Sequence, residues 1–297
     1  MKLKRLIVSA AAALLGLAGA PAEARETPPA GAVPGPALWR VTDADTTIYL
    51  FGTVHALPEG KEWFDARIER AFAAADEMVT EVDLSDQAAS TAAMQSAGLL
   101  PEGTSLRDLM APDNRMQFEA ALVGLGLPVE SLDRMEPWLA SLTMSLLPLL
   151  RQGYRTDSGV EMALSGRAEG KQRGALETIA QQIDLFDGMP MDAQLTFLDK
   201  TVEAIPEAKT SLDAMVAEWI EGDADSLAEL LNAELDDPVL YARLLTQRNA
   251  NWAEWVKWRL QQPGTVFVAV GAGHLAGKQS VQRLLKRRGV KVERVWQ

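Results

Sequence analysis

Short apolar runs, rich in β-branched and aromatic residues, alternate along the chain with longer amphipathic stretches. The short runs are typical of buried strands, and the longer stretches are typical of helices that pack through one face. Two of the short runs are separated only by Asp43-Ala44-Asp45 and predict a β-hairpin. The expected strands are 38–41, 46–51, 78–83, 173–177, 266–270 and 290–296.

Most of the remaining chain has leucine and methionine stripes at helical spacing. Asp157 or Ser158 is the expected N-cap of one helix, and Thr178 with Gln181 has capping-box spacing for another. The pattern predicts an α/β (α+β) fold, with a central mixed sheet of about six strands covered by many helices and a helical insert at 86–150. The other expected helices are 62–75, 87–97, 112–124, 138–150, several within 190–261, and 278–288.

Two of the expected strands are followed by a histidine. The segment Gly52-Thr53-Val54-His55 closes the first and Gly271-Ala272-Gly273-His274 closes the second, and the sequence contains no other histidine. In open α/β sheets, ligands bind beyond the carboxyl ends of the strands. Either histidine alone could simply lie in a loop, or in the core with its ring nitrogens hydrogen-bonded. Because the pattern is repeated, we expect both imidazoles at a functional site.

Two carboxylates are expected in the same sheet. Glu81 is predicted in the middle of strand 78–83, where its charge must be paired, bind a cation or face water at a sheet edge. Glu177 ends strand 173–177, where it would also favour the N-terminus of the next helix. Both side chains are therefore candidates for the site that the histidines mark.

Arg248 is the odd member of an apolar helical stripe. A guanidinium on such a face needs a carboxylate or an anionic ligand, unless its side chain snorkels to the surface. We expect Arg248 inside the site, where it would stabilise an anionic tetrahedral intermediate. The other members of the stripe are Leu244, Leu245, Trp252 and Trp255.

The chemistry available to these residues is activation of water. The sequence has no cysteine, no glycine-rich phosphate loop, no Gly-x-Ser-x-Gly elbow and no His-Glu-x-x-His motif. A His-His-Glu set could hold Zn²⁺ or Mn²⁺ with an open position for water. Alternatively, His55 with Glu81 could act as a general base unaided. Spacing does not choose between these alternatives.

The N-terminus predicts export. A basic start, an apolar core at 6–17 and Ala-x-Ala sites indicate a signal peptide at 1–24. That core is too short to span a bilayer, and no transmembrane segment is expected after cleavage. Residues 25–37, rich in Pro, Ala and Gly, predict a disordered linker before a hydrolase domain at 38–297. We therefore expect a periplasmic or secreted protein.

The charge of the chain limits its partners. The formal net charge is −12, which argues against nucleic acid as the main partner. The absence of cysteine excludes disulfides, a thiolate nucleophile and a lipid anchor on cysteine. A peptide or small-molecule substrate is the expected ligand.

Several motifs together resemble the TraB/GumN family. That family is similar to the TIKI metalloproteases and more distantly to the erythromycin esterases and ChaN-like proteins. The resemblance runs from about Leu38 to Trp296. The segments that carry it are Gly52-Thr53-Val54-His55, Glu81, Gly159-Val160-Glu161, Leu176-Glu177-Thr178 with Gln182, Arg248-Asn249, and Val270-Gly271-Ala272-Gly273-His274-Leu275-Ala276-Gly277.

The resemblance implies an exported metal-dependent hydrolase of a peptide or amide-like substrate. His55, Glu81 and His274 match the residues at the family's active centre and are the expected ligands of a divalent metal ion (Zn, Mn or Co). Arg248 matches the family's arginine. Glu161, Glu177 and Gln182 are expected to support the site.

Two alternatives remain. TIKI-like members are metal-dependent peptidases, whereas the esterase-like relatives use the histidine as a base without metal. The chain could therefore be a metal-independent esterase or amidase with His55 as general base. It could also be a non-catalytic protein that binds or sequesters peptides in the same crevice.

Overall fold

The computed structural model of the protein describes residues 29–83, 85–234 and 238–296. Its centre is a six-stranded mixed sheet in the order β6-β4-β7-β2-β1-β8, beside a two-stranded sheet of β3 and β5. This architecture confirms the predicted mixed α/β fold with about six strands. The strands are β1 (Leu38–Thr42), β2 (Thr46–Thr53), β3 (Leu57–Pro58), β4 (Glu77–Thr80), β5 (Tyr154–Arg155), β6 (Gln172–Ala175), β7 (Gly264–Gly271) and β8 (Val292–Arg294).

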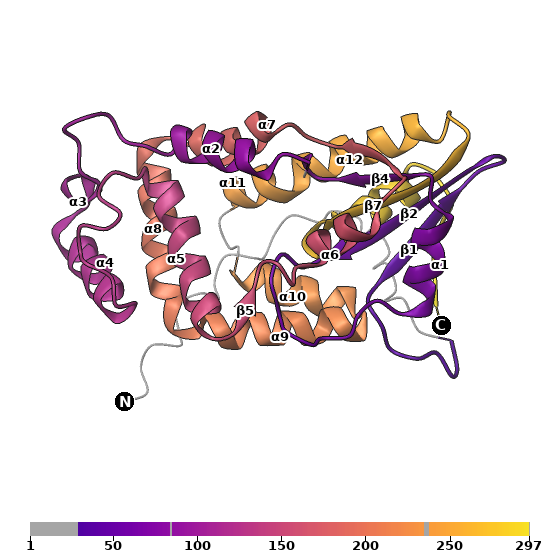
Figure 1. Cartoon of the computed structure of the whole chain (residues 1–297), viewed down its shortest axis with the longest axis horizontal. Coiled ribbons are helices and arrows are strands. Elements are labelled where there is room, and N and C mark those ends of the chain that lie inside the picture. The colour runs from indigo at the N-terminus through magenta and orange to yellow at the C-terminus, as the bar shows by residue number, and fades with distance from the viewer. Residues whose placement is uncertain (1–28, 84, 235–237, 297) are drawn as a thin grey trace, which may run out of the picture.

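Helices lie on both sides of the sheet and form a separate layer at the far end of the molecule (Figure 1). The helices are α1 (Ala66–Ala74), α2 (Gln87–Ala97), α3 (Leu106–Leu109), α4 (Pro112–Gly124), α5 (Pro137–Arg151), α6 (Val160–Arg167), α7 (Ile179–Asp187), α8 (Met191–Ala204), α9 (Ala208–Glu221), α10 (Ala224–Glu234), α11 (Pro238–Tyr241), α12 (Gln247–Arg259) and α13 (Val281–Arg287). Two 3-10 turns, η1 (Ile205–Glu207) and η3 (Ala272–Leu275), and one π-helical turn, η2 (Ala242–Thr246), complete the described elements.

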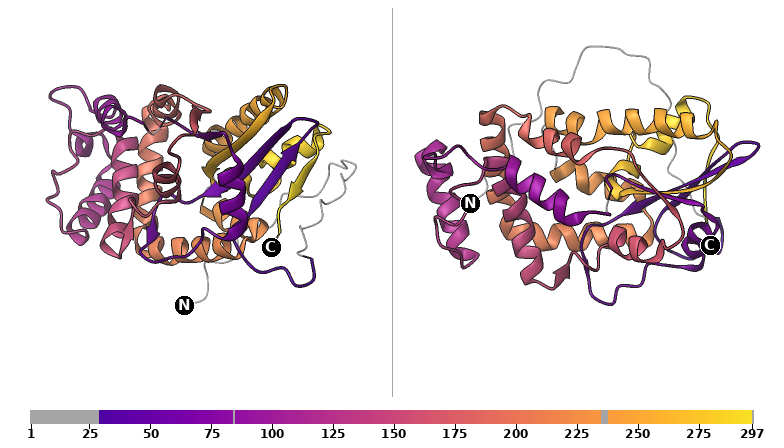
Figure 2. Two further views of the ribbon diagram at one scale, coloured as in Figure 1. Left: turned by 45° about the vertical axis from the view of Figure 1, so that its right-hand side comes forward. Right: turned by 45° about the horizontal axis from the view of Figure 1, so that its top comes forward.

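The sheet is buried on both faces. Along β7, Val266 and Val268 join one core cluster, whereas Phe267 and Ala269 join the cluster on the other side. Figure 2 shows α12 and α13 on the opposite side of the sheet from α1. Burial on both faces explains why β2 and β7 read as continuous apolar runs instead of alternating ones.

The helical insert has a core of its own. Leu106, Phe118, Leu122, Met144 and Leu198 are fully buried together, away from the sheet. These residues come from α3, α4, α5 and α8, which gather at one end of the molecule in Figure 1. The insert between the strand units was predicted, and its internal packing explains the leucine and methionine stripes.

Four strands of the sheet run parallel, and this places their carboxyl ends at one edge. β2 pairs with β7, β7 with β4, and β4 with β6, all in parallel. In this register Thr53 lies opposite Gly271, and Thr80 lies opposite both Ala269 and Ala175. The predicted hairpin is also confirmed, since β1 pairs antiparallel with β2.

Several local predictions are wrong in detail. The strands expected at 173–177 and 290–296 are Gln172–Ala175 and Val292–Arg294, and the helix expected from 278 begins at Val281. The helix expected from residue 62 begins at Ala66, because the side chain of Asp65 accepts from the N–H groups of Arg67 and Ile68 and caps it there. The strand expected over 78–83 ends at Thr80, whose hydroxyl donates to the carbonyl of Val82 at 2.6 Å. Glu81 therefore follows the strand instead of lying in its middle.

Another error concerns the start of α6. Its N-cap is Gly159, not Asp157 or Ser158, and no side chain caps the helix. A Cβ at position 159 would lie 2.3 Å from the carbonyl oxygen of His55. Only glycine allows this close approach, which fixes the helix start against the segment after β2.

The N-terminal predictions lie mostly outside the described residues, which begin at residue 29. At the end of the expected linker, Ala37 is buried and the carbonyl of Pro36 accepts from buried Arg67. Arg67 also donates to the carbonyl of Val295, so it ties the segment before β1 to the end of the chain. Within the described residues, no helix has the length and apolar character needed to cross a bilayer.

Candidate active site

The parallel strands bring four of the predicted residues to one edge of the sheet. His55 comes two residues after β2, Glu81 directly after β4, and Glu177 two residues after β6. His274 lies in η3, which directly follows β7. The register of the sheet, and no feature of local sequence, therefore places these side chains together.

Arg248, at the start of α12, is the centre of the network that joins them. Its Nε and Nη2 each donate to one oxygen of Glu177 at 2.8 Å, and Nη2 also donates to Glu81 Oε2 at 2.5 Å. Its Nη1 bonds His274 Nε2 at 3.0 Å and donates to the carbonyl of Leu244 at 3.1 Å. A guanidinium carries five N–H groups, and these five contacts engage all of them.

This network changes the role expected for Arg248. The predicted carboxylate partner exists, and there are two, Glu81 and Glu177. Because the five N–H groups already have acceptors, the arrangement leaves none for an anionic intermediate. Arg248 neutralises the two carboxylates and fixes the position of His274.

Both carboxylate oxygens of Glu81 have protein partners. Its Oε2 accepts from Arg248 and, at 3.1 Å, from Gln182 Nε2, while its Oε1 accepts from Gly271 N at 2.7 Å. Burial by itself would raise the pKa of Glu81, but the imidazoles, the Arg248 charge and the Gly271 N–H lower it to about 2. Glu81 is therefore a carboxylate at every physiological pH.

His274 is held as a neutral imidazole. A guanidinium can only donate, so His274 Nε2 accepts from Arg248, and the ring proton lies on Nδ1, 2.6 Å from Asn249 Oδ1. Asn249 Nδ2 donates to the carbonyl of Gln279, which fixes the orientation of its amide. Burial lowers the pKa of His274 to about 3, and the charge of Arg248 acts in the same direction.

His55 differs from His274 in being open to solvent. Its side chain is 78% exposed, and its Nδ1 lies 2.7 Å from Glu161 Oε1, which also accepts from the hydroxyl of Thr53 at 2.6 Å. The partner of His55 is thus Glu161. The metal-free alternative had assumed that it was Glu81. The negative charge of Glu161 raises the pKa of His55 to about 9.

The docking of α6 on the segment after β2 creates this pair. Val160 N donates to the carbonyl of Val54 at 3.0 Å, next to the close contact of Gly159 with His55. These contacts place Glu161, in the first turn of α6, beside the imidazole. Glu161, expected as a supporting residue, thus lies in contact with His55.

Several residues of the network were not predicted. Trp252 Nε1 donates to Glu177 Oε1 at 3.0 Å, and its ring lies against His274 with 4.2 Å between centroids. Asn249 contacts His274 directly, and Thr53 donates to Glu161, the partner of His55. The one local signal for Trp252 was its spacing of one helical turn from Arg248, and for Asn249 its place beside that arginine.

The pairing of His55 with Glu161 predicts a shift in titration. In the variant Glu161→Gln the charge that stabilises the imidazolium is gone, so the pKa of His55 is expected to fall from about 9 toward its ordinary value of 6.5. Between these two values the variant has a neutral His55 where the native protein has a charged one. Proton NMR of the imidazole signals measures this directly, since the chain has two histidines and His274 does not titrate in that range.

An unchanged titration of His55 in Glu161→Gln would contradict this assignment. The variant Asp157→Asn serves as control, because the Asp157 carboxylate is exposed and pairs with Arg155 instead of a histidine. It is expected to leave both imidazole titrations in place.

The three predicted metal ligands converge but do not present a metal-binding geometry. The atoms that face one another across Gly271 are Glu81 Oε1, His55 Nε2 and the carbon Cδ2 of His274. Both ring nitrogens of His274 are engaged, by Arg248 and Asn249. Within the described parts of the chain, no group of three His, Asp or Glu side chains is arranged to hold a metal ion. As arranged, the residues offer two donors, one fewer than a catalytic zinc site uses.

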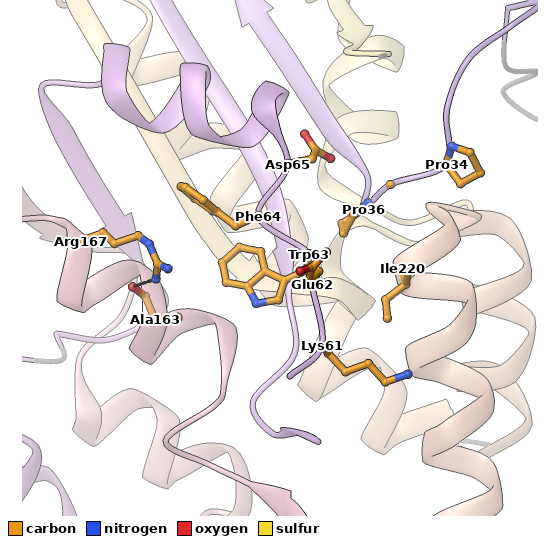
Figure 3. Close-up of a pocket in the computed structure, with 11 residues that line it drawn as sticks. Pro34, Pro36, Lys61, Glu62, Trp63, Phe64, Asp65, Ala163, Arg167 and Ile220 are labelled. Atoms are coloured by element: carbon orange, nitrogen blue, oxygen red, sulfur yellow. Dashed lines mark hydrogen bonds between the residues drawn. The ribbon is translucent and has the colours of Figure 1, made fainter. Parts of the chain in front are cut away.

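A separate pocket of about 660 Å³ opens between the segment before β1, the segment before α1, and helices α6 and α9 (Figure 3). Trp63 and Phe64 form part of its wall, and Arg167 lies over the Phe64 ring at 4.9 Å. None of the predicted site residues lines it. The pocket is therefore distinct from the site at the sheet edge.

Comparison with known proteins identifies relatives of this chain. The model of the TraB/PrgY/gumN family matches residues 37–294. Metalloprotease TIKI2 of Danio rerio is 27% identical over 300 residues, which cover 82% of this chain and 58% of that protein. The uncharacterized protein YbaP of Escherichia coli is 24% identical over 254 residues, with 84% of this chain and 92% of that protein covered.

An uncharacterized protein of Treponema pallidum is 24% identical over 269 residues, which cover 84% of this chain and 80% of that protein. No solved structure shows significant similarity. The family match spans the whole sheet, from the residue before β1 to the end of β8, and includes every residue of the network. The chain therefore belongs to the TraB/PrgY/gumN family.

Proposed function

We propose that the protein is an exported hydrolase that cleaves a peptide or amide-like bond with water activated at His55. The observation that carries the proposal is the pairing of a solvent-exposed imidazole with a largely buried carboxylate at the carboxyl edge of the sheet. The similarity to proteins named metalloproteases supports hydrolysis of peptides as the reaction class.

In the proposed reaction His55 acts as general base and then as general acid. Glu161 accepts a hydrogen bond from Nδ1–H, so the neutral ring keeps its proton on Nδ1 and has its lone pair on Nε2, which faces the space over Gly271. Nε2 takes a proton from water as the water oxygen bonds to the carbonyl carbon. It then gives this proton to the leaving nitrogen as the carbon–nitrogen bond breaks. Glu161 stabilises the imidazolium between the two steps.

The elevated pKa gives this mechanism a pH dependence. The base form of His55 is the minor form at neutral pH and increases as pH rises toward about 9. A rate governed by this base therefore increases over the same range. Glu81, whose pKa is about 2, and Arg248, whose carboxylate partners raise its pKa, keep their charges over this range.

A metal-dependent hydrolase is the second candidate. It is favoured by the names of the TIKI relatives, and His55, Glu81 and His274 are the residues that would have to hold the ion. For this, His274 Nε2 would have to release Arg248. A divalent ion bound there would lower the pKa of a bound water.

The test is hydrolysis of a peptide and ester library by the purified protein, with and without excess chelator. We expect cleavage of peptides that survives chelation and increases with pH up to about 9. The variant His55→Gln is the matched control for contaminating activity. If chelation abolishes activity and Zn²⁺, Mn²⁺ or Co²⁺ restores it, the general-base mechanism is wrong and the metal-dependent mechanism takes its place. Peptides that bind without being cleaved would make the protein a binding protein.

A further inference from the structure

The backbone conformation of Gly271, the last residue of β7, does not require glycine. Its φ of −49° and ψ of 134° lie in an extended region that any L-amino acid adopts. It is absent from the glycines with positive φ. Its N–H donates to Glu81 Oε1 at 2.7 Å, which a residue with a side chain could do equally well. What distinguishes glycine at this position is the space that it leaves.

The space that a side chain would fill belongs to the candidate site. A Cβ at position 271 would lie 3.1 Å from Glu81 Oε1, 3.6 Å from His274 Cδ2 and 4.0 Å from His55 Nε2. These are the three nearest atoms, and each comes from a different side chain of the site. Glycine keeps open a small cradle bounded by a carboxylate oxygen and two imidazoles.

We propose that the cradle over the Cα of Gly271 binds the water molecule that attacks the substrate. This proposal rests on the proposed hydrolase function and adds the position of one reactant. It also makes Gly271 a positioning residue, which acts through the room it leaves. Gly271 is thereby distinguished from the other glycines of the loop.

The polar groups around the cradle suit water. Glu81 Oε1 accepts one hydrogen bond, from Gly271 N, and has capacity for a second. Neutral His55 Nε2 is also an acceptor. A water molecule donates to both acceptors and keeps its lone pairs for the carbonyl carbon, whereas a carbonyl oxygen has no proton to donate. A site with at least two polar partners is what an ordered water requires.

The test compares Gly271→Ala with Gly273→Ala. In the control, the new methyl group would meet Leu231 Cδ1 at 3.2 Å and Leu245 Cδ2 at 3.7 Å, and no other atom within 4 Å apart from its chain neighbours Ala272 and His274. The two substitutions are thus matched in chemistry, in loop position and in tightness of fit. We expect Gly271→Ala to reduce kcat for library peptides about 100-fold, as a displaced reactant does, while Gly273→Ala keeps native turnover. Both variants should melt close to the native protein.

High-resolution crystal structures provide the readout that does not depend on a substrate. We expect an ordered water within hydrogen-bond distance of Glu81 Oε1 and His55 Nε2 in the native protein and in Gly273→Ala, and its absence in Gly271→Ala. An empty cradle or a bound cation in the native protein, or native turnover by Gly271→Ala, would overturn the proposal. If the native protein cleaves nothing, the proposed hydrolase function is wrong. The presence or absence of the ordered water then tests by itself whether the cradle binds water.

Discussion

The variant His55→Gln is expected to lose about 10²- to 10⁴-fold in kcat, the usual contribution of a positioned general base. Glutamine can still donate a hydrogen bond to Glu161, but it cannot take a proton from water. Because the His55 side chain is 78% exposed, little packing is lost with the imidazole. The free energy of unfolding should therefore fall by about 1 kcal/mol, since Glu161 keeps hydrogen bonds from Thr53 and from the glutamine amide.

Steady-state kinetics on a cleaved library peptide, together with denaturant unfolding, measures both quantities for the same preparation. Peptide binding to His55→Gln, followed by calorimetry, shows whether the crevice is intact. A variant that keeps native kcat would remove His55 from the chemistry. A variant that loses kcat only because it unfolds would contradict the exposed position of the ring.

The variant Arg248→Met is expected to cost about 3–5 kcal/mol in the free energy of unfolding, the range for removal of one partner from a buried ion pair. The side chains of Arg248, Glu81 and Glu177 are 11%, 14% and 12% exposed. Methionine fills much of the volume but leaves two carboxylates facing each other without a cation. Turnover should fall too, because His274 loses the donor on its Nε2.

Arg248→Lys separates charge from geometry. Lysine keeps the positive charge, but it has three N–H groups where the guanidinium has five, and it cannot bond both oxygens of Glu177 in parallel. We expect its stability to lie between that of the native protein and that of Arg248→Met. The sequence predicted that Arg248 stabilises an anionic intermediate in the site. In the structure, Arg248 supports the fold as well as the site.

Arg40→Met is the control for charge removal, because Arg40 forms an exposed ion pair with Glu293 at 2.9 Å. Its cost should be about 0–1 kcal/mol. Adding Glu177→Gln to Arg248→Met should recover part of the loss, since one of the two unpaired carboxylates is then neutral. Equal denaturation midpoints for Arg248→Met and Arg40→Met would show that the buried network does not stabilise the fold.

Local sequence was sufficient for the elements whose signal lies within a few residues. The hairpin of β1 and β2, the capping box of Thr178 and Gln181, and the extents of α2 and α4 follow from short-range patterns, and the structure confirms them. Periodicity and turn residues report local preferences, so they identify such elements well. They failed at residue 159, where a long-range contact with His55 decides the helix start.

The sequence by itself also selected His55, Glu177 and His274 as candidates at strand ends, and Glu81 as a carboxylate within a strand. Only the tertiary structure decided which of them interact. Arg248 and Glu81 are 167 residues apart and form a 2.5 Å hydrogen bond. The partner of His55 became Glu161 because α6 docks beside β2. Partnerships of this kind depend on strand register and helix docking, which arise from packing over the whole domain and leave no mark on local spacing.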